Sequence, residues 1–192
     1  MTLEILNQKI LNEADEILYR YELYDLLKKY GKPFITGSYL LKLMTWRDLD
    51  IYLKLDSMNS EKFFELGNEI MIKLDSHKMN YRNELLAKTP HLPKGLYWGI
   101  HTMLFDEKWK IDIWGIDSEQ YKQKLTDIKD ISTNINGIHR NSILSLKSQL
   151  HSHPLYRKKF FSKDIYDSVI YGQIQTLEEF KVWLYKKKEI KI

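Results

Sequence analysis

The sequence contains no cysteine, so two common ways of stabilising a small domain or building a site are excluded. Neither a disulfide framework nor a cysteine-based zinc site can form. The absence of cysteine is also typical of a reducing compartment, where disulfides do not persist. We therefore expect a cytoplasmic protein.

Long apolar runs are missing as well. Charged residues such as Glu4, Lys9 and Arg20 interrupt residues 1–30, so this stretch has no apolar core of the kind that a signal peptide requires. No run approaches the length of a membrane span, and internal repeats and low-complexity segments are lacking. These absences favour a globular protein without a membrane partner.

Neither sign of charge is in large excess. The 30 Lys and Arg residues against 26 Asp and Glu residues give a net charge of +4. This charge suits an anionic small ligand but is too weak to indicate a nucleic-acid-binding protein. The length of 192 residues allows one domain, with or without a helical appendage, and a hydrophobic content of 43% is enough for a core.

Residues 34–54 are the most informative stretch of the chain. An apolar strand signal is followed by Gly37 and Ser38, then by a short amphipathic run, and then by a second strand signal that begins at Asp48. Because side chains alternate along a strand, Asp48 and Asp50 share one face, and the apolar residues between and after them share the other. Two adjacent carboxylates repel each other, and a divalent cation is the common compensation.

Gly37 and Ser38 predict a second feature of the same site. A Gly-Ser turn at the start of a helix leaves backbone N–H groups free, glycine lets a ligand come close to the backbone, and the helix N-terminus favours an anion. The alternative is an ordinary strand-to-helix turn, where both residues are also expected. Beside two carboxylates we favour a phosphate cradle next to a metal site, which is the equipment for phosphoryl or nucleotidyl transfer.

This arrangement resembles the signature of the DNA polymerase beta-like nucleotidyltransferase superfamily. Gly37-Ser38, nine intervening residues and then Asp48-x-Asp50 match its Gly-Ser or Gly-Gly pair, short helix and carboxylate-x-carboxylate strand. The kanamycin and lincosamide nucleotidyltransferases are members of this superfamily. The motif itself covers a small part of the chain, and the order of predicted elements through about residue 115 also suits the family.

The resemblance implies a third carboxylate from a later strand. Asp112 is the best candidate, because alternation in residues 109–114 places it on the face opposite to Ile111 and Ile113. Asp106 and Asp117 are alternatives, although both fall at predicted turns, where Asp is common for local reasons.

Several further residues are candidates for the site. Trp46 and Arg47 directly precede the two carboxylates and are placed to contact a nucleotide, with local packing and pairing as the alternative for both. Of the two, we assign Arg47 to nucleotide binding. Tyr97, Trp98 and His101 could line the cleft, although burial in a strand core is the simpler interpretation.

Two other groups are given structural interpretations. His151 and His153 precede a proline at a predicted helix end and have no carboxylate nearby in the sequence, which indicates a polar helix terminus rather than a metal site. The basic runs 157–159 and 186–188 are interpreted as solvated faces, with contact to a triphosphate or an RNA backbone as the alternative.

The remaining patterns predict the fold class. We expect strands near 34–35, 48–53, 79–86, 95–105 and 108–114, and helices over 2–30, 60–73, 118–125, 137–150 and 162–171, with a last helix after the capping box of Thr176 and Glu179. Residues 95–105 and 108–114 should form a hairpin with 106–107 at the turn, and Gly115 should end the second strand. The fold is then α/β in the α+β sense: a mixed, mostly antiparallel sheet flanked by helices. A soft boundary separates a nucleotidyltransferase core (1–117) from a C-terminal helical region (118–192).

The resemblance also implies a reaction. A nucleoside monophosphate would pass from a nucleoside triphosphate such as ATP to an acceptor hydroxyl. Asp48, Asp50 and Asp112 would bind one or two Mg²⁺ ions, and Gly37 and Ser38 would hold the β- and γ-phosphates. We expect a small-molecule acceptor, because the chain is short and only mildly basic.

Two other classes of function stay open at this point. One is a nucleotidyltransferase that acts on RNA or protein, as some toxin–antitoxin members of the superfamily do; a continuous basic track leading to Asp48 and Asp50 would indicate it. The other is a non-catalytic nucleotide-binding module with the same fold, which would show a site blocked by a side chain or unable to hold metal.

Overall fold

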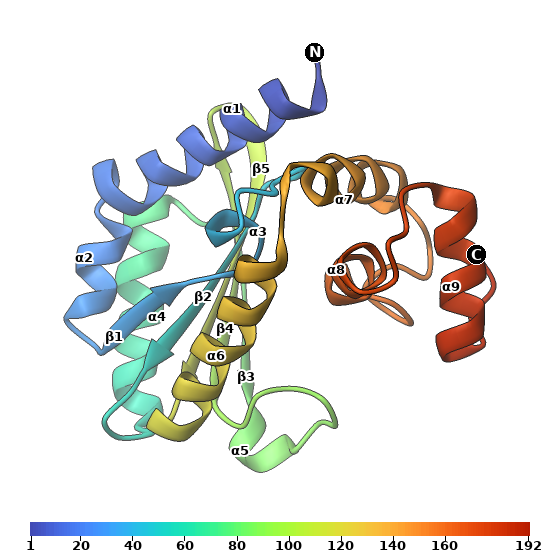
Figure 1. Cartoon of the computed structure of the whole chain (residues 1–192). Helices are drawn as coiled ribbons and strands as arrows, with labels where there is room; N and C mark the ends of the chain where they lie inside the picture. The colour runs from blue at the N-terminus through green and yellow to red at the C-terminus, as the bar shows by residue number, and fades with distance from the viewer.

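A five-stranded sheet forms the centre of the fold (Figure 1), and the computed structural model describes all of residues 1–192. The strands are β1 Lys32–Ile35, β2 Asp48–Lys54, β3 Lys78–Asn83, β4 Leu96–Leu104 and β5 Glu107–Ile116, in the order β1-β2-β5-β4-β3. β2 and β5 are parallel, and every other neighbouring pair is antiparallel. The predicted fold class, a mixed and mostly antiparallel sheet flanked by helices, is confirmed.

The central strands β2 and β5 alternate between buried and half-buried residues over most of their length. Leu49 and Leu53 of β2 and Ile111 and Ile113 of β5 are completely buried on one face of the sheet. The polar side chains of both strands are therefore left together on the other face. The period of two, which the sequence shows in both segments, produces this separation.

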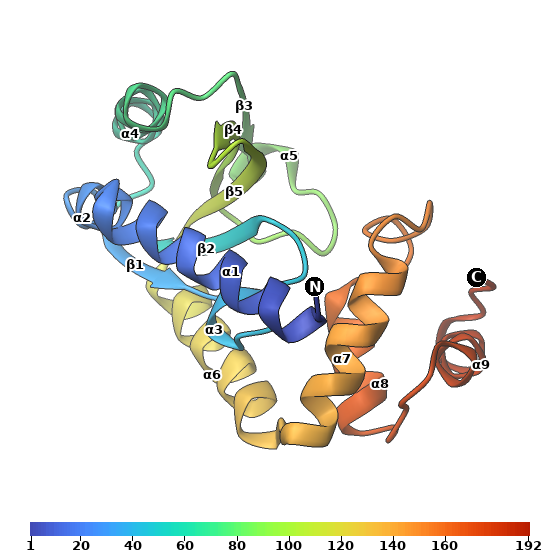
Figure 2. The same ribbon diagram turned by 90° about the horizontal axis from the view of Figure 1, so that it is seen from above.

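The apolar face is covered by N-terminal helices and by α4 (Figure 2). These helices are α1 (Leu3–Asp15), α2 (Leu23–Lys28) and α4 (Ser60–Leu74). The indole N–H of Trp98 in β4 donates to the carbonyl oxygen of Phe63 in α4 at 2.8 Å, and their rings stack within the same core. Burial of this large apolar cluster supplies the main stabilisation of the sheet.

The N-terminal segment is not one helix, and the prediction for residues 2–30 is wrong in this respect. A π-helical turn over Glu16–Arg20 follows α1, and Glu22 adopts a φ of 53° before α2 begins. All three pieces present buried residues such as Ile10, Ile17 and Leu26 to the same core. Hydrophobic periodicity identifies the buried residues, but it does not record the point at which the backbone turns.

Helices from the second half of the chain lie on the polar side of the sheet and beyond it. They are α6 (Ser118–Asn134), α7 (Gly137–Leu150), α8 (Ser162–Ile170) and α9 (Leu177–Lys188). α6 runs beside β2, and the other three stand at one end of the sheet (Figure 1). None of the helices combines the length and the apolar character that a bilayer crossing requires.

A second hydrophobic cluster holds α7, α8 and α9 together. It also includes Leu41 and Leu43 from the loop that follows α3 (Gly37–Leu40). The Gly-Ser segment is therefore attached at one end to the sheet and at the other end to the C-terminal helices. The division at residue 117 remains a prediction, since Asp117 directly joins β5 to α6 and caps that helix.

Several boundaries differ from those predicted. The β4–β5 turn consists of Phe105 and Asp106, which adopt φ values of 58° and 57°, so it lies one residue earlier than expected. Gly115 does not end β5, because it continues the pairing with β2 and β4. β3 ends at residue 83 and is followed by the short helix α5 (Glu84–Ala87), and α6 extends well beyond residue 125.

Candidate functional site

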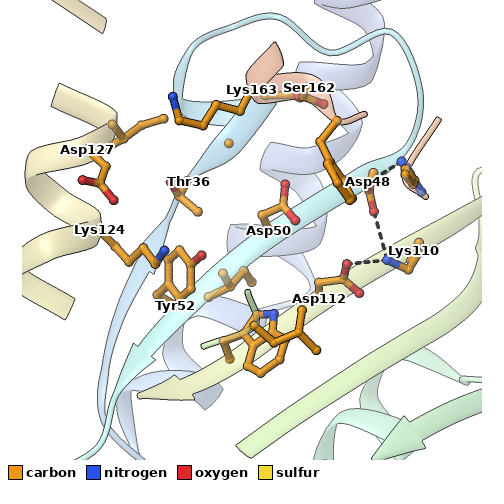
Figure 3. Close-up of a pocket in the computed structure, with 18 of the residues that line it drawn as sticks. Thr36, Asp48, Asp50, Tyr52, Lys110, Asp112, Lys124, Asp127, Ser162 and Lys163 are labelled. Carbon is orange, nitrogen blue, oxygen red and sulfur yellow. Dashed lines mark hydrogen bonds and ion pairs between the residues drawn. The ribbon is translucent and has the colours of Figure 1, made fainter. Parts of the chain in front are cut away.

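A cleft lies between the polar face of the sheet and helices α6 and α8 (Figure 3). Its volume of about 700 Å³ is in the range of small-molecule binding sites. Five of the six predicted site residues line it: Gly37, Ser38, Asp48, Asp50 and Asp112. The fold therefore gathers the Gly-Ser pair and all three predicted carboxylates at one place.

The carboxylates come from two neighbouring strands. Asp50 and Asp112 are direct neighbours in the parallel pairing of β2 and β5, and Asp48 is the neighbour of Lys110 two residues earlier. All four side chains project from the polar face (Figure 3). The strand phase of Asp112, predicted from the alternating sequence, is confirmed.

The two alternative third carboxylates lie elsewhere. Asp106 is part of the β4–β5 turn, and Asp117 accepts the backbone N–H of Gln120 at 2.8 Å as the cap of α6. Neither residue lines the cleft. Both have the local roles at turns and caps that Asp commonly plays.

Asp50 is the one of the three carboxylates whose side chain forms no hydrogen bond or ion pair in the structure. It lies at the floor of the cleft. Burial, together with the negative charges of Asp48 and Asp112, raises the pKa of Asp50 to about 8, against the opposing effect of Lys110 and Arg157. A cation bound at this carboxylate would release the proton, because a ligating carboxylate must be ionised.

The other two carboxylates have partners. Lys110 forms a short ion pair with Asp112, and its Nζ also lies 3.7 Å from Oδ1 of Asp48. Arg157 places Nη2 at 2.7 Å from Oδ2 of Asp48. The hydroxyl of Tyr97 donates to Oδ1 of Asp112 at 2.7 Å. These contacts hold Asp48 and Asp112 in place on the floor of the cleft.

The donor set suits a hard divalent cation, although the side chains are not gathered around one. No group of three or more His, Cys, Asp or Glu side chains is close enough to hold a metal ion as it stands. Carboxylate oxygens are nevertheless the ligands that Mg²⁺ prefers, Asp50 is unpartnered, and Oδ1 of Asp48 is buried without a hydrogen bond. Asp48, Asp50 and Asp112 would fit such an ion once the ammonium of Lys110 withdraws.

Gly37 lies against the carboxylates and has a backbone that requires glycine. Its φ is +61°, and a Cβ at this position would lie 2.5 Å from Oδ2 of Asp50. The preceding residue, Thr36, donates its backbone N–H to the carbonyl oxygen of Asp50 at 2.9 Å. The start of α3 is thus positioned by β2 itself, and it packs so closely on the carboxylate of Asp50 that no Cβ fits between them.

Ser38 is supported by a lysine that the sequence did not indicate. Lys147 of α7 is completely buried, and its Nζ donates to Oγ of Ser38 at 2.7 Å and to the carbonyl oxygen of Leu43. The ring of Trp46 lies 4.6 Å from the same ammonium. Burial lowers the pKa of Lys147 to about 7, against the opposing effect of Asp48 and Asp50. An amine that is partly protonated near neutral pH therefore lies directly behind the predicted phosphate cradle.

Trp46 packs within the protein. Its ring stacks on His151 at a centroid distance of 4.7 Å, and the guanidinium of Arg157 lies 5.4 Å from the same ring. Cation–π and stacking contacts of this kind hold Lys147 and Arg157 beside the cleft. Trp46 also lines the cleft, so both interpretations made for it, local packing and contact with a nucleotide, are compatible with the structure.

Arg47 is the one predicted site residue that does not reach the cleft. Its guanidinium donates to both carboxylate oxygens of Glu13 in α1, at 2.6 and 2.9 Å, and lies 3.2 Å from Glu107. The side chain is only 11% exposed. Arg47 thus fastens α1 to the start of β5, and we remove it from the candidate nucleotide-binding residues.

Some of the remaining candidate residues line the cleft, and others lie outside it. Tyr97 lines the cleft, whereas Trp98 is buried in the core and His101 lies outside the cleft. Of the two basic runs, the first brings Arg157 into the cleft, and the second lines a different cavity between α6, α8 and α9. Arg157 and Lys147 are separated from the motif by about a hundred residues. Arg157 belongs to a basic run for which contact with a triphosphate was the alternative interpretation, whereas no local pattern marked Lys147.

No protein-family model matches the chain, and no curated protein matches it.

Proposed function

We propose that the protein is a Mg²⁺-dependent nucleotidyltransferase that moves a nucleoside monophosphate from a nucleoside triphosphate to a hydroxyl group of a small molecule. The observation that carries the proposal is the pairing of Asp50 with Asp112 across β2 and β5, with Gly37 closely packed on Asp50. Three carboxylates and a glycine-started helix are thereby concentrated on one floor of a cleft. Such a site is suited to a metal-bound triphosphate.

Different residues of the chain bind the phosphates, hold the metal and orient the acceptor. The backbone at Gly37 and the hydroxyl of Ser38 bind the β- and γ-phosphates, and Lys147 supplies positive charge behind Ser38. Asp48, Asp50 and Asp112 hold the metal. When bound, the metal neutralises charge on the phosphates and helps to align them for attack. Asp112, the farthest of the three from α3 across the strand pair, also orients the acceptor hydroxyl.

The proposed reaction needs no reagent other than the triphosphate and the acceptor. The acceptor oxygen forms a bond to the α-phosphorus, the bond from that phosphorus to the bridging oxygen breaks, and pyrophosphate leaves. The hydroxyl proton passes to a carboxylate of the site, and we assign this role to Asp112. A short chain with a net charge of +4 and a cleft of about 700 Å³ favours a small acceptor over an RNA.

One observation favours a second candidate, a non-catalytic nucleotide-binding module. Lys110 lies between Asp48 and Asp112, so a side chain occupies the space where a shared ion would be held (Figure 3). In a module of this kind the lysine would replace the metal permanently, and the protein would bind a triphosphate without dependence on Mg²⁺. The two candidates are therefore separated by metal dependence.

The test uses two radiolabels and one matched variant. The protein is incubated with nucleoside triphosphates labelled at the α- or the γ-phosphorus, with Mg²⁺ and a panel of hydroxyl-bearing small molecules. Nucleotidyl transfer moves the α-label to the acceptor and releases the γ-label as pyrophosphate; transfer of the γ-label would instead indicate a kinase. Asp50→Asn should abolish the transfer.

A binding measurement accompanies the transfer assay because the acceptor is unidentified. A triphosphate at ~100 times its Kd should stabilise the fold by about 2.7 kcal/mol, and only when Mg²⁺ is present. Asp50→Asn should remove this rise in melting temperature. An equal rise in the variant, or one that is independent of Mg²⁺, would contradict the proposal and favour the non-catalytic module.

A further inference from the structure

Lys110 stands between two of the three carboxylates. It lies two residues before Asp112 on β5, so both side chains project from the same face, and it is the direct neighbour of Asp48 on β2. Its ammonium pairs with Asp112 and lies 3.7 Å from Oδ1 of Asp48 (Figure 3). The side chains of the carboxylates are only 16% and 15% exposed, so these contacts are less screened than those of a surface pair.

A divalent cation and Lys110 would compete for the same oxygen atoms. Oδ2 of Asp112 is the partner of the ammonium, and Oδ1 of Asp48 has no hydrogen bond and lies 3.7 Å from the ammonium. An ion bound to both carboxylates would lie close to the ammonium, and the two cations would repel each other. Binding of the ion therefore requires Lys110 to leave.

The structure offers Lys110 a second environment. A separate cavity on the other side of the lysine is lined by Lys110 itself and by Asp106 and Glu107 at the start of β5. The lysine is 30% exposed, and its flexible four-carbon side chain can change direction without a change in the strand. Asp106, which forms no ion pair, would compensate the charge of Lys110 after it had moved, whereas Glu107 is already paired with Arg47.

We propose that Lys110 stands in for the metal ion while the cleft is empty and makes metal binding depend on the triphosphate. The inference rests on the proposed function. Without a triphosphate, the ion must displace an existing ion pair and gains only carboxylate ligands. With a triphosphate, its anionic oxygens add both ligands and negative charge, so the exchange becomes favourable. By linkage, the metal and the triphosphate then raise each other's affinity by the same factor.

The test measures binding of Mn²⁺, a paramagnetic substitute for Mg²⁺, by electron paramagnetic resonance, with and without a non-hydrolysable triphosphate. Lys110→Met removes the competing charge and keeps much of the side-chain length. Lys108→Met is the matched control, because it removes the same charge two residues earlier from a side chain that forms no ion pair and lines the same second cavity. Lys110→Gln is a second variant, in case methionine impairs folding.

We expect Lys110→Met to bind Mn²⁺ at least tenfold more tightly than the wild type when no triphosphate is present, and Lys108→Met to stay within twofold of the wild type. The factor by which the triphosphate improves Mn²⁺ binding should fall correspondingly. Asp50→Asn in the Lys110→Met background should remove the gain, which places the ion in the carboxylate site.

Two results would overturn the inference, and they are distinguishable. Equal Mn²⁺ affinities of the wild type and the Lys110 variants, with triphosphate-dependent binding intact, would show that the lysine does not compete, and the proposed function would stand. No Mn²⁺ binding by any protein, even with the triphosphate, would overturn the proposed function together with the inference.

Discussion

Asp50 and Asp112 are direct neighbours across the only parallel strand pair of the sheet, although they come from distant parts of the sequence. In a parallel pair the side chains of neighbours point the same way, so the two carboxylates are forced together on the polar face. Burial and the neighbouring charges then raise the pKa of Asp50. The fold thus holds mutually repelling carboxylates close together, an arrangement that is characteristic of a functional site.

Asp112→Asn should separate transfer from binding. Nucleotide transfer should fall by at least a hundredfold, because the residue that orients the acceptor is lost, whereas Mg²⁺-dependent triphosphate binding should largely survive on Asp48 and Asp50. Removal of one of three mutually repelling carboxylates would by itself make the variant more stable than the wild type. Because Asp112 accepts from Tyr97 and pairs with Lys110, we expect a loss of about 1–3 kcal/mol instead. Thermal unfolding and the α-label assay measure the two effects, and a variant that transfers normally would exclude Asp112 from the site.

Gly37→Ala should impair both stability and triphosphate binding. The new Cβ would lie 2.5 Å from Oδ2 of Asp50, and the φ of +61° costs a non-glycine residue about 1 kcal/mol or more. Gly137→Ala is the control, because nothing lies within 4 Å of a Cβ at the start of α7. The control should leave the melting temperature and the affinity nearly unchanged. Equal behaviour of the two variants would show that close packing at Gly37 is unimportant.

Lys147 predicts a pH dependence of stability. Its pKa is about 7 in the folded protein and 10.5 in the reference state, so the unfolded chain binds the proton more tightly between these values. The free energy of unfolding should therefore rise with pH from about 7 to 10 through this group. Denaturant titrations of the wild type and Lys147→Met across that range isolate its contribution, since tyrosines elsewhere titrate in both proteins. Parallel curves would contradict the assignment.

Arg47 should be important for folding and not for nucleotide binding. Removing one partner of a buried ion pair costs about 3–5 kcal/mol, and both Arg47 and Glu13 are about 90% buried as side chains. We expect Arg47→Met to lower the melting temperature by roughly 10 °C. The double variant with Glu13→Gln should recover part of this loss, as a double-mutant cycle would show. A selective loss of triphosphate affinity without destabilisation would restore the original assignment.

The parts of the site that could be predicted are those that depend on alternation along a strand. Asp48, Asp50 and Asp112 follow the period of two, and burial of their apolar neighbours determines the face on which they lie. The glycine required at position 37 is also marked by its neighbours in the sequence. In each case a short segment contains the physical cause.

The parts that could not be predicted depend on contacts between distant segments. Arg157 reaches the cleft, and Lys147 lies behind Ser38, only because a second hydrophobic cluster brings α7 and the following loop against the segment after α3. Arg47 has the same charge as a phosphate-binding residue would have, but its partner Glu13 lies in a helix whose position the sequence pattern does not record. The break at Glu22 likewise leaves the hydrophobic stripe unchanged.

The most direct measurement is a crystal structure with Mn²⁺ and a non-hydrolysable nucleoside triphosphate, in which anomalous scattering locates the metal. We predict a metal peak bonded to Asp48, Asp50 and Asp112, the β- and γ-phosphates against Gly37 and Ser38, and the ammonium of Lys110 turned away from Asp112. A metal or triphosphate bound outside this cleft, or a triphosphate bound here with Lys110 still between the carboxylates and no metal, would contradict the account.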